Sequence, residues 1–224
     1  MKSLIKIFSL IIFVLCVIAC EKDNYDPPKS QLSGKIMYNE TSIGLKGTGE
    51  SVQLQLYQDG WQKRDPIAVF AKQDGTFEAL LFNGTYKLIT RNSNGPWINK
   101  QDTVVVEVKG NTQCEIEVTP YFTISDPQIK MENNIVKGKL TVHKIVENAK
   151  IGKVTLLLNK TQFVDETVKI AEKNITNGQP GSYEIDLDVS DNKEVNSAHA
   201  IYARVGVKAA GADQAIYSQV IRLR

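Results

Sequence analysis

Two tryptophans carry the most specific chemistry along this chain, because each lies among polar residues in a turn-like segment. Trp61 follows an aspartate and a glycine, and Trp97 lies in a stretch rich in asparagine. An indole face can stack on the C–H face of a sugar ring while neighbouring amides and carboxylates bind its hydroxyls. In the alternative interpretation, each indole only covers the core of its own domain. The candidate carbohydrate-binding residues are Asp59, Trp61, Asn94, Trp97 and Asn99.

Cys20 stands at the end of a segment typical of exported proteins. Lysines precede an apolar run over residues 7–19 that is interrupted only by a serine. The run is too short for a membrane span, which needs about 20 apolar residues. Its end, Val17-Ile18-Ala19-Cys20, resembles the lipobox of bacterial lipoproteins, whose cysteine takes diacylglycerol on sulfur. We expect residues 1–19 to be a signal peptide and Cys20 to carry a lipid anchor, with an ordinary secretory signal as the alternative.

Residues 20–30 comprise this anchor and a charged, proline-containing tether without periodicity. Such a tether could extend over at most about 33 Å. The pair Lys22-Asp23, two places behind the cysteine, resembles an export signal for display on the outer face of the outer membrane. The predicted location is therefore the outer membrane, lipid-anchored, at the cell surface.

The charge balance argues against nucleic acid as a partner. Removal of residues 1–19 takes away two of the 27 basic residues and none of the 25 acidic ones, so the mature chain has 25 of each. Nucleic-acid-binding proteins instead show basic patches and a high pI. No nucleic-acid partner is therefore expected, and the membrane is the partner that lipid on Cys20 would provide.

Cys114 is the one cysteine left after the signal peptide and the lipidated position, so no intramolecular disulfide is expected. It shares strand parity with Ile116 and Val118, while Glu115 and Glu117 have the opposite parity. The thiol is predicted to face the core and to be structural, because a buried thiol without a nearby base is inert.

The sequence offers no recognisable catalytic machinery. His143 and His199 lie in separate strand-like runs, and no histidine or cysteine pair has metal-ligand spacing. Residues 188–194 supply oxygen ligands for calcium but lack the glycine and spacing of a hand-type loop, which favours a solvated turn. We expect a protein that is not an enzyme, with no cofactor and no metal site; an uncharacterised enzyme remains an alternative.

The elements that would position these residues are predicted to be strands of two β-sandwiches. In the first domain, residues 31–120, Val52, Leu54 and Leu56 alternate with glutamines, as in a half-buried strand. The strands over residues 103–108 and 112–119 are predicted to form a hairpin at Lys109-Gly110-Asn111. Short strands separated by turn signals favour a sandwich.

The second domain, residues 121–224, restarts the strand pattern after Pro120, a plausible hinge. Tyr183 and every second residue to Val189 are apolar, and the residues between them are acidic. This half is typical of an immunoglobulin or fibronectin type III module. Residues 162–173 could be a helical turn or an edge strand.

A family resemblance covers nearly the whole mature chain. The segments Lys72-Gln73-Asp74-Gly75-Thr76-Phe77 and Phe82-Asn83-Gly84-Thr85-Tyr86 resemble the prealbumin-like, carboxypeptidase-regulatory-type β-sandwich. Together with Asn94-Gly95-Pro96-Trp97 and Val118-Thr119-Pro120-Tyr121, they are similar to the lipoproteins grouped as domain of unknown function 3823. The resemblance implies a surface lipoprotein often encoded beside glycan-import receptors, with a fibronectin-like second domain and no catalytic residues to carry over.

We therefore expect a non-enzymatic cell-surface lipoprotein that assists glycan capture or import. Direct carbohydrate binding is one way in which it could do so. The alternative is a structural scaffold or adhesin-like partner of an outer-membrane receptor complex. Exposure of both tryptophans would favour binding, and their burial would favour the scaffold. Asp102-Thr103-Val104 also resembles the acceptor motif for O-linked glycans, with Thr103 as the acceptor, although a simple strand start explains it as well.

Overall fold

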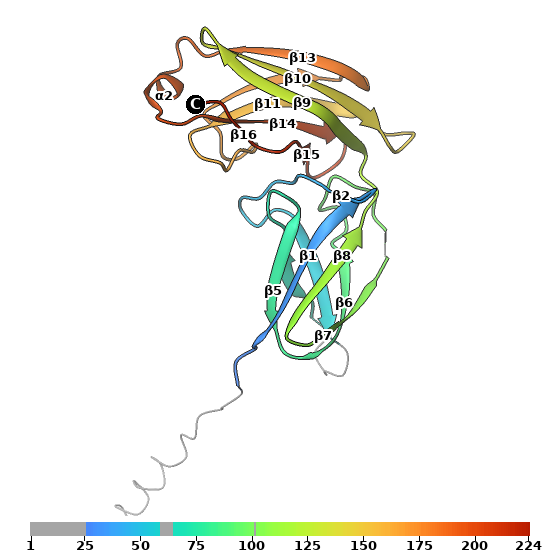
Figure 1. Cartoon of the computed structure of the whole chain (residues 1–224). Coiled ribbons are helices and arrows are strands. Elements are labelled where there is room, and N and C mark those ends of the chain that lie inside the picture. Colours follow the sequence, from blue (N-terminus) through green and yellow to red (C-terminus); the bar gives the residue numbers. More distant parts are fainter. Residues whose placement is uncertain (1–25, 59–64, 101) are drawn as a thin grey trace, which may run out of the picture.

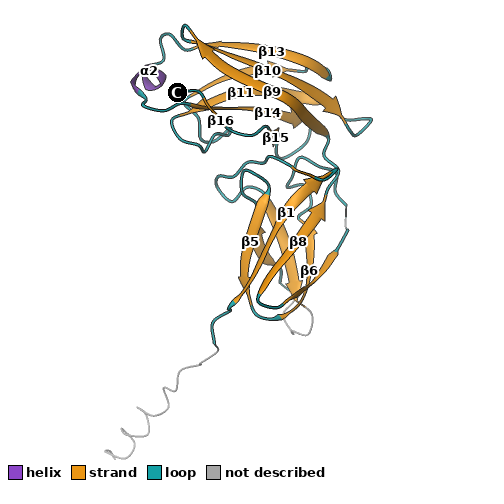
Figure 2. Cartoon of the chain, viewed as in Figure 1, coloured by secondary structure: helices purple, strands orange, loops and turns teal. Residues whose placement is uncertain are grey.

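The computed structural model describes residues 26–58, 65–100 and 102–224, so Cys20, Asp59 and Trp61 lie outside the described residues. Within these ranges the regular secondary structure is nearly all β-strand, and the chain forms two domains, one seated on the other (Figure 1). Figure 2 shows one short helix, α2 (Lys193–Ser197), among the described residues. The predicted all-β class with two consecutive sandwiches is confirmed. No helix of the described ranges is long and apolar enough to cross a membrane.

The first domain contains β1 (Ser30–Tyr38), β2 (Thr41–Ser42), β3 (Gln53–Gln58), β4 (Ile67–Phe70), β5 (Thr76–Leu81), β6 (Gly84–Thr90), β7 (Val104–Val108) and β8 (Asn111–Glu117). One sheet has β1 at its centre, paired antiparallel with β2 and β5 and parallel with β8. The other has the order β4-β3-β6-β7. The alternation predicted for β3 holds, since Leu54 and Leu56 are fully buried between half-exposed glutamines.

The predicted hairpin between β7 and β8 is wrong, although its turn exists. Gly110 has φ +63°, the left-handed conformation that glycine adopts without strain. However, β7 pairs with β6 in one sheet, and β8 pairs with β1 in the other. The turn therefore carries the chain from one layer of the sandwich to the other.

The second domain contains β9 (Phe122–Glu132), β10 (Ile135–Lys144), β11 (Ile151–Asn159), β12 (Ala171–Thr176), β13 (Gly181–Asp188), β14 (Tyr202–Ala209), β15 (Ile216–Tyr217) and β16 (Ile221–Arg222). Its sheets have the orders β13-β10-β9 and β12-β11-β14-β15, with β16 also paired to β14. The alternation predicted for β13 holds, with Ile185 buried and Glu184 and Asp186 exposed. Of the ambiguous residues 162–173, residues 162–170 form a loop and residues 171–173 begin β12, which lies at the edge of its sheet, so the edge-strand alternative holds for the last three.

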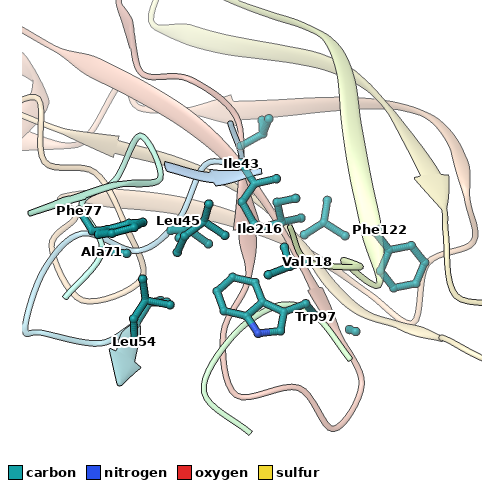
Figure 3. Packing of buried hydrophobic residues seen from close by; sticks show 14 of the residues in the cluster. Ile43, Leu45, Leu54, Ala71, Phe77, Trp97, Val118, Phe122 and Ile216 are labelled. Atoms are coloured by element: carbon teal, nitrogen blue, oxygen red, sulfur yellow. The ribbon is translucent and has the colours of Figure 1, made fainter. Parts of the chain in front are cut away.

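The larger of two hydrophobic clusters among the described residues runs through both domains. Figure 3 shows its middle, where Ile43 and Leu45 of the first domain lie near Ile216 of the second. The predicted hinge at Pro120 is a buried corner, because Pro120 pairs with Trp97 and the Tyr121 N–H donates to the Pro96 carbonyl at 3.0 Å. The two sandwiches are therefore joined by packing as well as by the chain.

Arg204 of β14 is the central polar residue of this junction, with 1% of its surface exposed. Its guanidinium donates to the carbonyl of Ser218 in its own domain at 2.6 Å. It also donates across the junction to the carbonyls of Leu45 at 2.9 Å and Gln73 at 2.8 Å. The cation lies 4.5 Å from the centre of the Tyr217 ring, within cation–π range.

Further hydrogen bonds surround this arginine. The Thr48 hydroxyl donates to the buried carboxylate of Asp165 at 2.6 Å, and the Tyr217 N–H donates to the Gly44 carbonyl at 2.9 Å. Desolvation lowers the pKa of Arg204 to about 10, although Tyr217 and Asp165 counteract it. The guanidinium therefore stays charged at neutral pH and holds the two domains together.

Arg204→Ala is expected to lower the free energy of unfolding by about 3 kcal/mol, because the carbonyls of Leu45, Gln73 and Ser218 would lose a buried donor. Urea denaturation followed by circular dichroism measures the change. Arg222→Ala is the matched control, since Arg222 is exposed on β16 and its loss should change stability by less than about 0.5 kcal/mol. Equal stability of the two variants would contradict the role given to Arg204.

Cys114 of β8 is a free, half-buried thiol that packs against the core, as its strand parity predicts. Burial, with a smaller effect of the Glu115 charge, raises the pKa of the thiol to about 11. Only about one thiol in a thousand would then be ionised at pH 8, and the thiolate is the reactive form.

Alkylation of Cys114 by iodoacetamide should therefore be slow at pH 8 and should accelerate as the pH approaches 11 in the folded protein. Residues 21–224 contain no other cysteine, so mass spectrometry of the Cys114 peptide reports thiol alkylation separately from any alkylation of lysines. The same chain unfolded in urea is the control and should react at the rate of an ordinary thiol. Rapid labelling of the folded chain at pH 8 would refute the burial argument.

Candidate functional site

Trp97 is not available to stack on a sugar, which corrects the expectation for this residue. Its side chain is 2% exposed and belongs to the core near the domain junction (Figure 3). Gly95 lies directly against the indole, since a Cβ atom at Gly95 would come within 2.2 Å of the ring. The loop thus folds back to place its largest apolar side chain inside, and Trp97 covers the core.

The two candidate asparagines of this loop, Asn94 and Asn99, make hydrogen bonds within the fold. Asn94 accepts a hydrogen bond from the Gln53 N–H at 2.6 Å and donates to the Ser51 carbonyl at 2.8 Å, which ties the loop to β3. Asn99 accepts from the Ser93 N–H at 2.7 Å and donates to the Ser93 hydroxyl at 3.3 Å. Both asparagines remain predicted ligand residues, because a hydrogen bond within the fold positions an amide without excluding a ligand.

The remaining candidates keep their status as predictions. Asp59 and Trp61 fall outside the described residues. Thr103 is exposed just before β7, a position compatible with both the O-glycan acceptor and the simple strand start.

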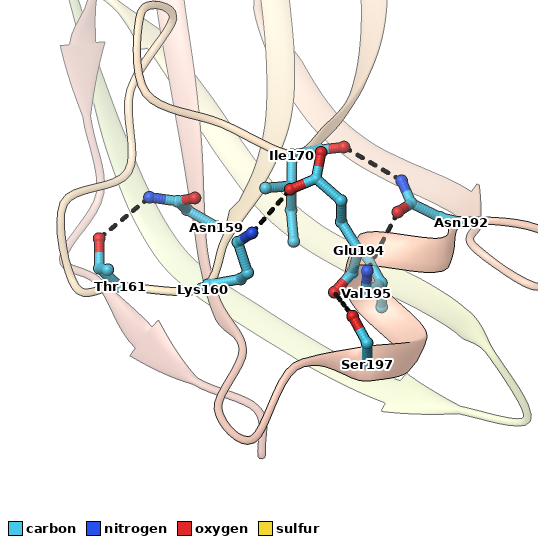
Figure 4. Close-up of polar contacts among 8 residues, drawn as sticks. All are labelled: Asn159, Lys160, Thr161, Ile170, Asn192, Glu194, Val195 and Ser197. Carbon is cyan, nitrogen blue, oxygen red and sulfur yellow. Dashed lines mark hydrogen bonds and ion pairs between the residues drawn. The ribbon is translucent and has the colours of Figure 1, made fainter.

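The loop over residues 188–194 uses its oxygen atoms within the fold. Asp188 accepts from the N–H of Ser190 at 2.9 Å and from its hydroxyl at 2.6 Å. Asn192 caps α2, and Glu194 pairs with Lys160 at 2.7 Å (Figure 4). Among the described residues, no group of three or more histidine, cysteine, aspartate or glutamate side chains could hold a metal ion.

Sequence reasoning missed one nucleophile and base pair, because strand register alone creates it. Ser125 Oγ of β9 lies 2.8 Å from His143 Nε2 of β10, on an outer sheet face. A catalytic serine also needs a third group that orients the histidine and donors for an oxyanion. The pair lines none of the three hollows described next, so it is not assigned a catalytic role.

Over the part of the chain that the structure describes, three surface hollows are considered as ligand sites, each within the usual range of about 300 to 1,000 Å³. The sheet hollow, about 600 Å³, lies over β1, β5 and β8 and includes Ser33, Lys35, Lys72, Glu78, Gln113 and Glu115. The junction hollow, about 310 Å³, includes Lys72, Gln73, Asp74, Phe163, Arg204 and Gln219. The Tyr38 hollow, about 410 Å³, includes Tyr38, Asn39, Thr41, Ser42, Thr123 and Gln219.

The junction hollow displays Phe163, an aromatic side chain that is 49% exposed. Asn159 holds its loop by donating to the Phe163 carbonyl at 2.7 Å, and Gln73 donates to the Gln162 carbonyl at 3.2 Å. The next residue, Val164, is fully buried, so the backbone direction leaves Phe163 facing outward. The sequence did contain a signal for Phe163, since it is an aromatic residue among polar residues in a segment without periodicity. The same signal identified the two tryptophans as candidates.

Polar groups with fixed positions flank this ring. Burial tends to raise the pKa of Asp74, but hydrogen bonds from the Thr76 hydroxyl and N–H, with the charge of Lys72, hold it below its ordinary value. Lys72 pairs with Glu78 at 2.8 Å, and both side chains are about half exposed. The hollow thus combines an apolar ring face with an ionised carboxylate, a cation and amides, which are the groups that a sugar contacts.

Two models of one family match consecutive parts of the chain. "Protein of unknown function (DUF3823) N-terminal domain" matches residues 30–119, and "Domain of unknown function (DUF3823_C)" matches residues 122–222. No curated protein is detectably similar to the chain.

Solved structures give the same result. A DUF3823 family protein from Parabacteroides merdae is 50% identical, covers 89% of this chain and 100% of its own, and has a TM-score of 0.86. One from Bacteroides ovatus is 32% identical, covers 87% of this chain and 98% of its own, and has a TM-score of 0.78.

A more distant structure from Bacteroides uniformis, described as a "putative carbohydrate binding protein", is 16% identical, covers 88% of this chain and 99% of its own, and has a TM-score of 0.73. At that identity the similarity shows the fold alone. Because the two family models together span most of the sequence and a relative of 50% identity covers 89% of it, this chain belongs to the DUF3823 family.

Proposed function

We propose that this chain is a non-enzymatic cell-surface lipoprotein that binds carbohydrate at the junction hollow and so assists glycan capture or import. The observation that carries the proposal is the exposed ring of Phe163 beside Gln73 and Asp74. Sugar binding uses this combination because the ring accepts the C–H face while amides and carboxylates bind hydroxyls. The "putative carbohydrate binding protein" from Bacteroides uniformis, which has the same fold, is consistent with it.

The proposed place of action is the outer membrane, to which lipid on Cys20 would hold the chain. The first described strand begins at Ser30, so the nine residues 21–29 would separate the anchor from the folded part. A tether of that length reaches at most about 33 Å, which keeps the domains near the surface. Capture of a polymer close to import receptors requires that proximity.

The second candidate is a scaffold that holds a receptor component at a fixed height. The buried junction around Arg204 favours it, because hydrogen bonds from one side chain to Leu45 and Gln73 resist bending between the domains. A scaffold would need no sugar contact at Phe163, so the same variant separates the two functions.

Phe163→Ala should weaken binding to any polysaccharide that retards residues 21–224 by about tenfold, because it removes the stacking face. Affinity electrophoresis against a panel of plant and host polysaccharides measures the effect. Phe163→Tyr should preserve binding, whereas Phe163→Leu should not, since leucine keeps apolar volume without a ring. Leu80→Ala is the matched control, because Leu80 is 62% exposed and lies outside the hollows.

Each variant is compared with the parent by thermal unfolding, so that loss of fold is not mistaken for loss of binding. No retardation by any polysaccharide would reject carbohydrate binding to those tested and favour the scaffold. Retardation that survives in Phe163→Ala would reject the assignment to the junction hollow.

Cys20→Ala should abolish metabolic labelling of the full-length chain with palmitate and should release the protein from the membrane fraction. Cys16→Ala is the matched control, because that cysteine lies within the predicted signal peptide and should be dispensable. Persistent labelling of the Cys20→Ala variant would contradict the anchor.

A further inference from the structure

We propose that the three hollows form one continuous path for an internal segment of an extended, uncharged polysaccharide. This inference rests on the proposed carbohydrate binding and names its substrate class. The path would run from the Tyr38 hollow, across the junction hollow, to the sheet hollow on the outer face of the first domain.

Shared lining residues place the three hollows next to one another. Gln219 lines both the Tyr38 hollow and the junction hollow, and Lys72 lines both the junction hollow and the sheet hollow. Gln219 is exposed, and Lys72 is about half exposed, so neither forms a closed wall between its two hollows. A molecule that leaves one hollow at these residues enters the next.

The size of the path favours a polymer over a small ligand. Each hollow alone, at about 310 to 600 Å³, is comparable with the pocket of a single small molecule. Three adjoining hollows of this size exceed what one or two sugar units can fill. All three lie open along the surface, so a chain could pass through without placing an end in a closed pocket.

Charges along the path favour a neutral chain. The sheet and junction hollows contain three cations, Lys35, Lys72 and Arg204, and three carboxylates, Asp74, Glu78 and Glu115. The Tyr38 hollow contains no charged side chain. A sulfated or uronic acid polymer would gain no net attraction here, whereas hydroxyl groups find partners such as Asn39, Thr41 and Gln113.

Aromatic side chains are placed in two successive hollows. Tyr38 is half-buried in the first, and Phe163 is 49% exposed in the next, on the other side of Gln219. Since the two come from different domains, their separation is fixed by the junction around Arg204. A path with fixed contacts binds an extended chain without the entropic cost of aligning two mobile domains.

The test is isothermal titration of residues 21–224 with size series of malto-, cello-, xylo- and manno-oligosaccharides, from the disaccharide to the longest soluble oligomer. Affinity should rise with length by at least about tenfold and then level off once the path is filled. Binding should change little with salt, because screening weakens only charged contacts. Chemical reduction of the sugar at the reducing end of the polysaccharide should leave its affinity unchanged, because the path binds an internal segment.

Variants in the two end hollows distinguish binding along the whole path from binding at the junction hollow alone. Tyr38→Leu and Gln113→Ala should weaken binding of the long oligomers and leave the shortest binders unaffected, whereas Phe163→Ala should weaken both. Leu80→Ala is the control outside the path, and thermal unfolding shows whether each variant is folded. If Tyr38→Leu does not fold, Thr41→Ala replaces it, because Thr41 is exposed and also lines the Tyr38 hollow.

Affinity independent of length, with no effect of the end variants, would overturn the path while leaving carbohydrate binding intact. A preference for acidic polymers that disappears with added salt would overturn the uncharged substrate class. Absence of binding to every oligomer and polymer would overturn both this inference and the proposed function.

Discussion

The buried guanidinium of Arg204 is the constraint on which the arrangement of the two domains depends. A planar cation with five donors costs free energy when it leaves water, unless its donors find acceptors. Here the acceptors are carbonyls of Leu45 and Gln73 in one domain and Ser218 in the other. No single domain supplies them all, so the hydrogen bonding of this one side chain requires both domains in one relative position.

That requirement also shapes the surface around the junction. Gln73, whose carbonyl accepts from Arg204, donates through its side chain to the loop that carries Phe163. Tyr217, on which the guanidinium rests, adjoins Ser218 and Gln219. Burial raises the pKa of the Tyr217 hydroxyl, in keeping with a ring enclosed by the junction. The hollows proposed to bind sugar are thus bordered by the same residues that join the domains.

The proposals for binder, scaffold and enzyme are weighed by which side chains line the surface hollows. The Ser125 and His143 pair lines none of the hollows, whereas the hollows combine aromatic rings with amides, hydroxyls and balanced charges. Such a lining suits many weak contacts with a hydroxylated polymer. A rigid two-domain body also suits a scaffold, and the two roles are compatible in one surface protein.

The sequence by itself determined the features that depend on neighbours along the chain. Alternation identified strands such as β3 and β13, the parity of Cys114 placed its thiol toward the core, and family motifs identified both domains. These succeed because a strand has a period of two residues, so local order dictates which side chains share a face.

Tertiary structure alone decided which aromatic residues are buried and which remain exposed. Trp97 and Phe163 both lie among polar residues in loops, yet Trp97 is 2% exposed and Phe163 is 49% exposed. The pairing of β8 with β1 rather than β7, and the contact of Arg204 with Leu45 across 159 positions, likewise join distant segments. Local pattern carries no information about such contacts, because they depend on which remote surfaces pack together once the whole chain has folded.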